Sequence, residues 1–216
     1  MSQNRGKLYV ISGPSGTGKG TICKELLKDN RNEFSVSMTT RAPREGEVHG
    51  KDYFFVSKEE FLEHVERGNF LEHATVFDNY YGTPKDMVIK RLERGRNVLL
   101  DIDVQGGLQV KAVMPEAVLI FILPPSLAVL RSRLEGRGTE TQEVIEKRLS
   151  KAVNDIKLIG EYEYIVVNDV LEEAADLARS IMKAENAKVP EKVMPVIRKY
   201  EQEEKGEKDQ CYFIHQ

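Results

Sequence analysis

Short apolar runs alternate along the chain with longer stretches in which apolar residues recur every three or four positions. The runs have strand length and cover residues 8–11, 98–100, 118–122 and 164–167. The stretches with helical spacing cover about 21–28, 104–113, 126–135, 142–159 and 171–186. This alternation predicts an α/β fold of parallel βαβ units, whose central strands are covered on both faces. Ligands of such sheets bind at the carboxyl ends of the strands.

Residues 34–83 break the alternation. Residues 34–37 and 53–56 have the composition of strands, and Arg- and Gly-rich loops join them. A β-rich insert between the first two βα units predicts a small substrate-binding subdomain.

Helix-start signals within and after this insert are specific. Ser57 followed by Glu60 has the spacing of a capping box, which predicts a helix from there to about Arg67. Thr83 and Pro84 mark the start of the next helix.

The pattern thus predicts three parts. Residues 1–33 and 84–187 form the core, and residues 34–83 form the insert. Residues 188–216 form a C-terminal extension, part helical and part flexible, because the sequence becomes polar and charged there.

Composition removes several classes of function. A chain of 216 residues with a net charge of −3 fits one α/β domain with an insertion and has no general attraction to nucleic acid or anionic lipid. No apolar run approaches the length of a membrane span, and residues 1–7 lack the apolar segment of a signal peptide. Cys23 and Cys211 are far apart and the histidines show no ligand spacing, so we expect a reduced, cytoplasmic setting.

A glycine-rich segment follows the first apolar run and opens the first helical stretch. It consists of Gly13, Pro14, Ser15, Gly16, Thr17, Gly18, Lys19, Gly20 and Thr21. Its glycines let successive backbone N–H groups surround an anion, and the following helix N-terminus adds positive charge. The lysine can then reach the outer phosphates of a nucleotide. A plain turn between strand and helix is the alternative, but such turns rarely end in Gly-Lys.

This phosphate-binding loop departs from the usual pattern at one position. Gly20 stands where a Ser or Thr hydroxyl would meet Mg²⁺, and Thr21 follows it. We therefore expect Mg²⁺ to be held mostly through water and substrate phosphates, with Thr21 and Asp101 as candidate ligands. Among proteins with this loop, the Gly-Lys-Gly-Thr ending resembles the nucleoside monophosphate kinases.

Carboxylates end the second core strand. Asp101 and Asp103 follow the apolar run 98–100, and an acid at this place in such a fold lies near the metal. Capping of the helix 104–113 is the alternative, and Asp103 has the position for it.

Several arginines form a second group of candidate residues for phosphoryl transfer. They are Arg41 and Arg44 in the insert, Arg131, Arg133 and Arg137 near a Gly-Arg-Gly turn, and Arg148 on the next helix. Guanidinium groups neutralise the charge that spreads over a phosphoryl group in transfer, and the turn would let this segment close as a lid. A charged surface with helix ion pairs is the alternative. A monophosphate acceptor is already ionised, so no general base is needed.

With these residues in view, the chain resembles guanylate kinases from about residue 7 to about residue 185. Each segment that carries the resemblance is weak evidence by itself, but their occurrence together in this order is specific for the family. The segments are 13–21, 37–47, 50–53, 70–72, 79–83, 100–106, 134–139 and 167–169. It implies the three-layer P-loop fold with a central parallel five-stranded sheet, a β-rich GMP-binding insert and a mobile Arg-rich lid at about 131–148. It also implies transfer of a phosphoryl group from ATP to GMP, with Mg²⁺, and a place in purine nucleotide metabolism.

The resemblance also implies roles for individual residues. The GMP phosphate is held by Arg41, Arg44, Tyr53 and Tyr81. Guanine is contacted by Ser37, Glu72 and Thr83, and further acceptor-site positions are Glu47 and Asp103. The ATP phosphates are contacted during transfer by Lys19, Arg137 and Arg148, and further residues of the ATP-binding site are Arg133 and Asn168. Catalysis falls to Lys19, Arg41, Arg137, Arg148 and Asp101.

The chemistry of guanine agrees with this assignment. One carboxylate can accept hydrogen bonds from N1–H and N2–H₂ of guanine, and a hydroxyl can donate to O6. Adenine lacks that donor pair and would leave a buried Glu72 carboxylate unsatisfied. Glu72 as an ordinary surface residue is the alternative.

Two rival functions stay open at this point. A kinase for AMP or another monophosphate fits the loop equally well but not the insert. A non-catalytic module of the same fold that binds proteins is the other, although such modules typically lack a working phosphate loop. Members of the family occur as monomers and as oligomers, so a homo-oligomer remains an open expectation, as does the use of dGMP.

Overall fold

The computed structural model describes residues 5–76, 78–136, 141–188 and 193–213. The chain separates into two compact units, Met1–Arg179 and Ser180–Gln216. The first unit contains both sheets of the protein.

A parallel five-stranded sheet lies at the centre of the first unit. Its strands are β1 (Leu8–Ser12), β2 (Asn32–Phe34), β7 (Asn97–Asp101), β8 (Val118–Leu123) and β9 (Tyr164–Val167). They are ordered β2-β7-β1-β8-β9, and every neighbouring pair is parallel. The predicted α/β fold and its sheet are therefore confirmed.

The strand predicted at residues 34–37 is wrong. Phe34 ends β2 in the central sheet, and the next strand begins only at Met38. The anchor of β2 is polar: Asn32 is buried, donates from Nδ2 to the Leu26 carbonyl at 2.8 Å and accepts from Asn97 Nδ2 at 3.0 Å. A search for apolar runs misses a strand that amide hydrogen bonds hold at the edge of a sheet.

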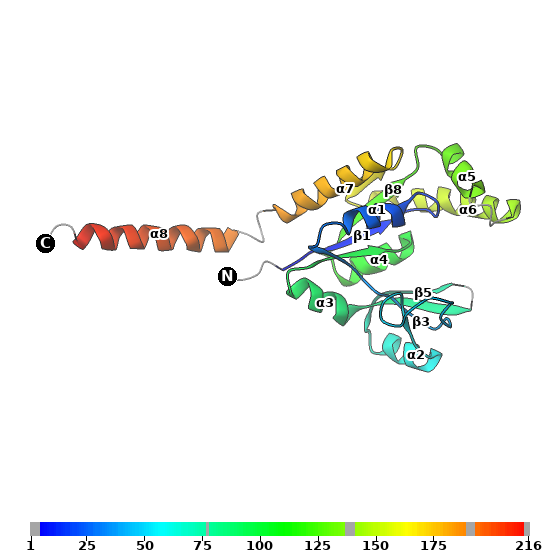
Figure 1. The fold of residues 1–216 in the computed structure, drawn as a ribbon, viewed down its shortest axis with the longest axis horizontal. Coiled ribbons are helices and arrows are strands. Elements are labelled where there is room, and N and C mark those ends of the chain that lie inside the picture. Colours follow the sequence, from blue (N-terminus) through cyan, green and yellow to red (C-terminus); the bar gives the residue numbers. More distant parts are fainter. Residues whose placement is uncertain (1–4, 77, 137–140, 189–192, 214–216) are drawn as a thin grey trace. The chain divides into compact units, whose positions relative to one another are not determined.

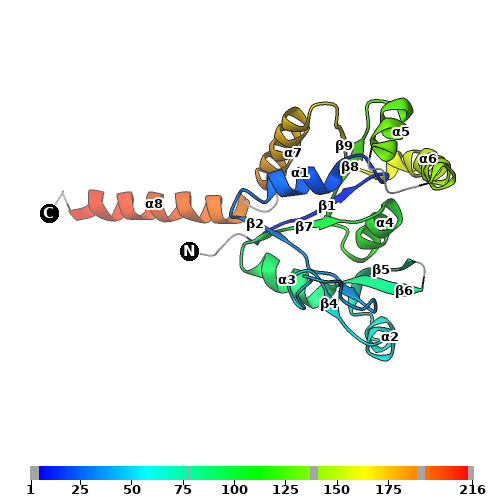
Figure 2. The ribbon, with the colours of Figure 1, turned by 45° about the vertical axis from the view of Figure 1, so that its right-hand side comes forward.

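Helices cover both faces of this sheet and form the outer layers. They include α1 (Lys19–Leu26), α3 (Lys85–Glu93) and α4 (Val104–Val113), whereas α5 (Leu127–Glu135) and α6 (Gln142–Ile156) pack on each other through a separate hydrophobic cluster and α7 (Leu171–Asn186) follows β9. Figures 1 and 2 show α1 on one face of β1 and α4 on the other. Two predicted ends shift: α1 begins at Lys19, directly at the end of the glycine-rich loop, and α6 ends at Ile156, before a 3-10 turn at Ile159–Glu161.

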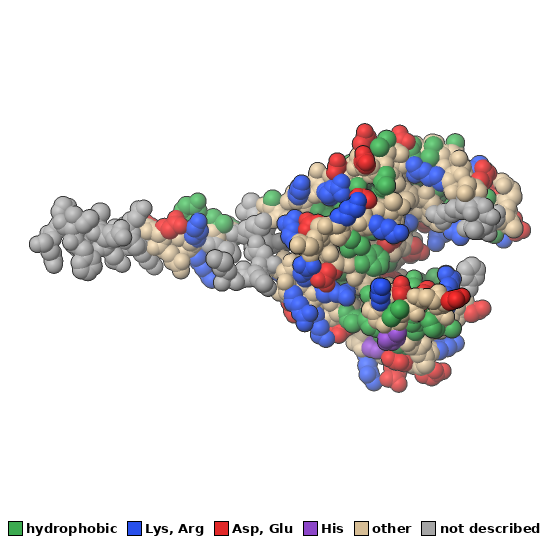
Figure 3. Space-filling view, viewed as in Figure 1, with side chains coloured by type: hydrophobic (Ala, Val, Ile, Leu, Met, Phe, Trp, Pro, Cys, Tyr) green, Lys and Arg blue, Asp and Glu red, His purple; other side chains and the backbone are tan. Residues whose placement is uncertain are grey.

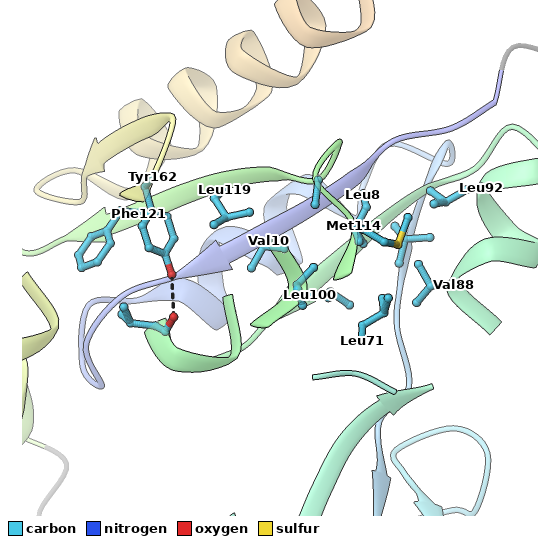
Figure 4. Packing of buried hydrophobic residues seen from close by; sticks show 14 residues of the cluster. Leu8, Val10, Leu71, Val88, Leu92, Leu100, Met114, Leu119, Phe121 and Tyr162 are labelled. Carbon is cyan, nitrogen blue, oxygen red and sulfur yellow. Dashed lines mark hydrogen bonds between the residues drawn. The ribbon is translucent and has the colours of Figure 1, made fainter. Parts of the chain in front are cut away.

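A hydrophobic cluster lies between the sheet and helices α3 and α4 (Figure 4). Alternate residues of the strands enter it, for example Leu8 and Val10 of β1. The Tyr162 ring packs edge-on against Phe121 with centroids 5.0 Å apart, and its hydroxyl donates to the Val104 carbonyl at 3.2 Å. This bond ties the first turn of α4 to the core and thereby fixes one side of the site.

A second sheet lies within residues 38–84. It has the order β4-β3-β6-β5 and is made of β3 (Met38–Thr39), β4 (Phe54–Phe55), β5 (Phe70–Val76) and β6 (Asn79–Pro84). Helix α2 (Lys58–Glu66) packs on it through Phe61, whose ring stacks on Phe70 with centroids 4.6 Å apart. The helix begins after Ser57, whose side chain accepts from the Glu60 N–H, as the capping pattern predicts. The insert therefore has a small hydrophobic core of its own.

The second unit continues α7 and holds α8 (Val193–Phe213). Helix α8 lies within the segment 188–216, for which a part-helical and part-flexible extension is predicted, and residues 189–192 and 214–216 lie outside the described part of the chain. None of the helices in the described residues is both long and apolar enough to cross a membrane.

Candidate active site

The glycine-rich loop joins β1 to α1 and needs glycine at defined places. Gly13, Gly16 and Gly18 have φ of 140°, 94° and 91°, a region that other residues rarely adopt. A Cβ on Gly13 would lie 2.2 Å from the Ile122 carbonyl oxygen, and one on Gly18 would lie 2.3 Å from Asn168 Nδ2. The loop conformation therefore requires glycine at these positions.

Lys19 bends back over this loop. Its Nζ donates to the carbonyls of Gly13 at 2.6 Å and Pro14 at 3.0 Å. Burial lowers the pKa of Lys19, and the nearby Asp101 carboxylate opposes that shift. The ammonium is thus held at the centre of the loop, where a bound phosphate would replace the carbonyls as its partner.

Asn168 supports the loop from the end of β9. Its buried side chain donates from Nδ2 to the Thr17 carbonyl at 2.7 Å. Arg133 on α5 donates from Nη2 to the Asn168 carbonyl at 2.9 Å. The buried Thr17 hydroxyl donates a hydrogen bond to the Pro14 carbonyl at 3.0 Å, so this side chain stabilises the loop conformation.

A cavity of about 330 Å³ opens in front of the loop and includes Lys19, Gly20, Thr21 and Asp101 in its lining. A Cβ on Gly20 would lie 3.3 Å from Asp101 Oδ2, so a larger residue there would crowd the carboxylate. Burial raises the pKa of Asp101, and Lys19 lowers it. In the described residues no group of three or more His, Cys, Asp or Glu side chains forms a metal site. One carboxylate and one hydroxyl suit Mg²⁺, which keeps most of its water.

The predicted acceptor-phosphate residues lie together in the insert. Arg41 Nη2 pairs with Glu47 Oε1 at 2.8 Å, and Glu47 Oε2 accepts from the Arg44 N–H at 2.7 Å. The Arg41 guanidinium lies over the Tyr53 ring, 5.5 Å from its centroid, and the Tyr53 and Tyr81 rings meet edge-on at 6.0 Å. The pairing with Glu47 raises the pKa of Arg41, so a permanent cation stands beside two phenol groups.

The predicted guanine residues Glu72 and Thr83 meet on neighbouring strands β5 and β6. Both are buried, and Thr83 Oγ1 donates to Glu72 Oε1 at 2.6 Å. Burial raises the pKa of Glu72, and the bond from Thr83 partly opposes this. The structure therefore contradicts the interpretation of Glu72 as a surface residue. Ser37 is half-buried at the entry to β3, where its carbonyl accepts from the Phe54 N–H at 2.9 Å.

Asp103 stands between the two sides of the site. It caps α4 by accepting from the Gly106 N–H at 2.9 Å through Oδ1, as the capping alternative predicts. A Cβ on Gly106 would lie 3.3 Å from Glu72 Oε2 and 3.5 Å from Asp103 Oδ1. The N-terminus of α4 thus brings Asp103 close to the guanine residues, and glycine leaves room for them.

A second cavity, of about 250 Å³, connects the loop with this end of α4; we call it the transfer cavity. It is lined by Ser15, Lys19, Asp101, Ile102, Asp103, Arg148, Lys151 and Asp155. Arg148 on α6 reaches the loop and donates from Nη1 to Ser15 Oγ at 2.8 Å. In the space-filling view the surface is hollowed between the part that carries α5 and α6 and the part that carries α2 and β5 (Figure 3).

One arginine of the predicted phosphate-binding group lies away from the phosphate loop. Arg131 forms an ion pair with Glu146 on the neighbouring helix, which agrees with the surface alternative for this arginine. Arg137, Gly138 and Thr139 lie outside the described residues, so only Gly136 of the Gly-Arg-Gly turn is described.

Sequence reasoning missed Lys151 and Asp155, which line the transfer cavity. They follow Arg148 on α6 by three and seven positions, so the three side chains share one helix face. This spacing was a signal that could have identified them.

Comparison with known proteins agrees with the geometry. The family model described as guanylate kinase matches residues 5–185. A guanylate kinase of Clostridioides difficile (strain 630) is 51% identical over 204 residues, which cover 94% of this chain and 100% of that protein. One of Clostridium tetani (strain Massachusetts / E88) is 53% identical over 185 residues, which cover 86% and 89%. The crystal structure of guanylate kinase from Anaplasma phagocytophilum superposes with a TM-score of 0.68 at 38% identity and covers 86% of this chain and 88% of that one.

Proposed function

The chain belongs to the guanylate kinase family and transfers a phosphoryl group from ATP to GMP, and we propose that it does so through the residues of the glycine-rich loop, the insert and α6. Relatives about half identical over most of the chain set aside the two rival functions, an AMP kinase and a non-catalytic module.

The glycine-rich loop binds the ATP phosphates in this proposal. Backbone N–H groups of residues 13–21 and the N-terminus of α1 surround them, and Lys19 leaves its carbonyl partners for phosphate oxygens. Arg148, whose side chain contacts Ser15 of the loop, neutralises the negative charge of the phosphoryl group during its transfer. Arg137 would join from the lid segment. Asn168, which holds the loop, lies on the adenine side.

The insert binds GMP. Arg41 and Arg44 neutralise its phosphate while the Tyr53 and Tyr81 hydroxyls donate hydrogen bonds, and Glu47 keeps Arg41 in place. The phosphate oxygen that attacks is already ionised near neutral pH, so the acceptor needs no general base. It forms a bond to the terminal phosphorus of ATP as the bond to ADP breaks.

The buried pair of Glu72 and Thr83 is the observation that carries the choice of guanine. The Glu72 carboxylate accepts from N1–H and N2–H₂ of the base, and the Thr83 and Ser37 hydroxyls complete its polar contacts. Glu72, Thr83 and Ser37 thus recognise the base, whereas the arginines bind the phosphate. We include dGMP as an acceptor, because the residues assigned here bind the base and the phosphate, which GMP and dGMP share.

Mg²⁺ fits the loop cavity as an ion held through ATP oxygens and water, with Asp101 and Thr21 as its protein partners. When bound, it neutralises charge on the phosphates of ATP. Asp101 also opposes the effect of burial on Lys19, because its carboxylate raises the pKa that burial lowers.

We retain the expected reduced, cytoplasmic setting, supported by the free and buried thiol of Cys23. We also retain a homo-oligomer as an expectation.

The test is ADP formation from ATP and Mg²⁺ with GMP, AMP, CMP and UMP offered separately. We expect a strong preference for GMP, which Glu72→Ala abolishes while ATP binding persists. Equal turnover of GMP and AMP would contradict the guanine assignment. The exposed neighbour His73 is a matched control, and His73→Ala should keep the preference.

A further inference from the structure

Two basic side chains of α6 reach opposite walls of the transfer cavity. Arg148 donates to Ser15 in the glycine-rich loop at 2.8 Å, whereas Lys151 Nζ lies 3.3 Å from Asp103 Oδ2 at the start of α4. Helix α6 therefore contacts the ATP side through one residue and the acceptor side through the other.

Lys151 completes the set of contacts that fix the Asp103 carboxylate. One carboxylate oxygen accepts from the Gly106 N–H, and the other faces the lysine. With both oxygens engaged, the carboxylate has a defined orientation next to Glu72, which also lies against Gly106. An acceptor bound there would meet a carboxylate that is already oriented.

The charges around the transfer cavity give Lys151 a second effect. The lining includes three cationic side chains, Lys19, Arg148 and Lys151, and three carboxylates, Asp101, Asp103 and Asp155. Without Lys151 the carboxylates outnumber the cations, and the uncompensated charge lies on Asp103 at the acceptor side, where it would repel the phosphate of GMP.

We propose that Lys151 is a positioning residue for GMP, which orients the Asp103 carboxylate and balances its charge. The inference rests on the proposed place of Asp103 in the acceptor site. It assigns Lys151 a role in acceptor binding rather than in folding.

The stability of the fold does not explain this ion pair. The Lys151 and Asp103 side chains are 62% and 49% exposed, and ion pairs so exposed contribute little to folding. A structural role thus predicts small changes in every property, whereas a positioning role predicts a change confined to GMP.

The first experiment compares Lys151→Met, Lys151→Arg and Lys147→Met by steady-state kinetics and thermal unfolding. Lys147 is a matched control, because it lies one turn earlier on α6 and pairs with Glu143 in solvent at 2.7 Å. We expect Lys151→Met to raise the KM for GMP about tenfold, the size of one lost charge-assisted contact, with the KM for ATP and the Tm unchanged. Lys151→Arg should restore most of the affinity, and Lys147→Met should behave as wild type. An unchanged KM for GMP in Lys151→Met would overturn the inference.

A double-mutant cycle with Asp103→Asn tests whether Lys151 acts through Asp103. Asn keeps the helix cap but removes the charge that faces the lysine. If Asp103→Asn raises the KM for GMP and Lys151→Met then adds nothing, the inference is supported; fully additive effects would overturn it. If Asp103→Asn leaves the KM for GMP unchanged, the proposed acceptor role of Asp103 fails, and the inference fails with it. If only Lys151→Met has no effect, the inference fails alone.

Discussion

Lys19 illustrates how one residue can matter for the reaction and little for the fold. Its ammonium is held by two loop carbonyls, and burial lowers its pKa, so its charge is not favoured by the folded protein alone. Bound phosphates reverse this balance, because they place anions where the carbonyls now lie.

We therefore expect Lys19→Ala to lower kcat by about 100-fold or more while the Tm changes little. Steady-state kinetics and thermal unfolding measure the two effects. Lys28→Ala, at an exposed residue that follows the same helix, serves as control and should be unchanged in both. Near-normal turnover in Lys19→Ala would refute the role of the lysine.

Glu72 shows the opposite relation between function and stability. Burial raises its pKa above the ordinary value of 4.5, so the folded state binds its proton more tightly than the unfolded state does. The contribution of Glu72 to stability is therefore most favourable at acid pH and is lost as the pH rises through the folded pKa. The carboxylate that recognises guanine is held at a cost to the fold.

For Glu72→Gln we expect a Tm about 2–4 °C higher than wild type at pH 7 and a smaller difference near pH 4. The amide oxygen can still accept from Thr83, so the gain comes from removal of the charge. Thermal unfolding across this range of pH measures it, and the same variant should lose its preference for GMP. A gain that grows toward acid pH would contradict the assignment.

At the scale of elements, the insert depends on α2. Phe61 is fully buried and stacks on both Phe70 and Tyr80, which belong to the strands next to the proposed GMP site. Because this cluster is separate from the main core, damage to it should remain within the insert.

We expect Phe61→Ala to destabilise the insert by about 3–5 kcal/mol and to raise the KM for GMP, with ATP binding retained. Amide hydrogen exchange locates the loosened segment, and kinetics compare the nucleotides. Leu62→Ala, at the exposed neighbour, should have effects near zero. Equal loss of ATP and GMP binding in Phe61→Ala would show that the insert and the core are not energetically separate.

Element by element, the apolar pattern predicted the four strands with continuous runs, and capping residues predicted the starts of α2 and α4. It failed for β2, where Asn32 and Asn97 bond to one another inside the sheet. It also ended α6 too late, since a 3-10 turn follows the helix with the same apolar spacing.

At the scale of the whole molecule, the proposed donor and acceptor residues face a hollow in the first unit (Figure 3). Phosphoryl transfer requires the two nucleotides to meet and water to be excluded, so we expect the insert and α6 to move toward each other when both are bound. ATP or GMP alone should produce only part of this movement.

Spin labels at Val48 of the insert and Val144 of α6 test this closure, because both side chains are exposed. The labels replace the two valines by cysteine in a Cys211→Ser background, and the buried Cys23 stays unlabelled. The distance between the labels should shorten with a bisubstrate analogue that joins adenosine and guanosine. An unchanged distance distribution would contradict the closure.

The sequence by itself determined the phosphate loop, the parallel α/β core, the β-rich insert and the family, because each depends on local chemistry or on periodicity within one element. Glycine at Gly13 and Gly18 and the order of the motifs are visible without a structure. Only the tertiary structure decided that Glu72 is buried against Thr83 and that Lys151 meets Asp103 across the transfer cavity. These contacts join residues from separate elements, and burial and charge depend on what surrounds a side chain rather than on its neighbours along the chain.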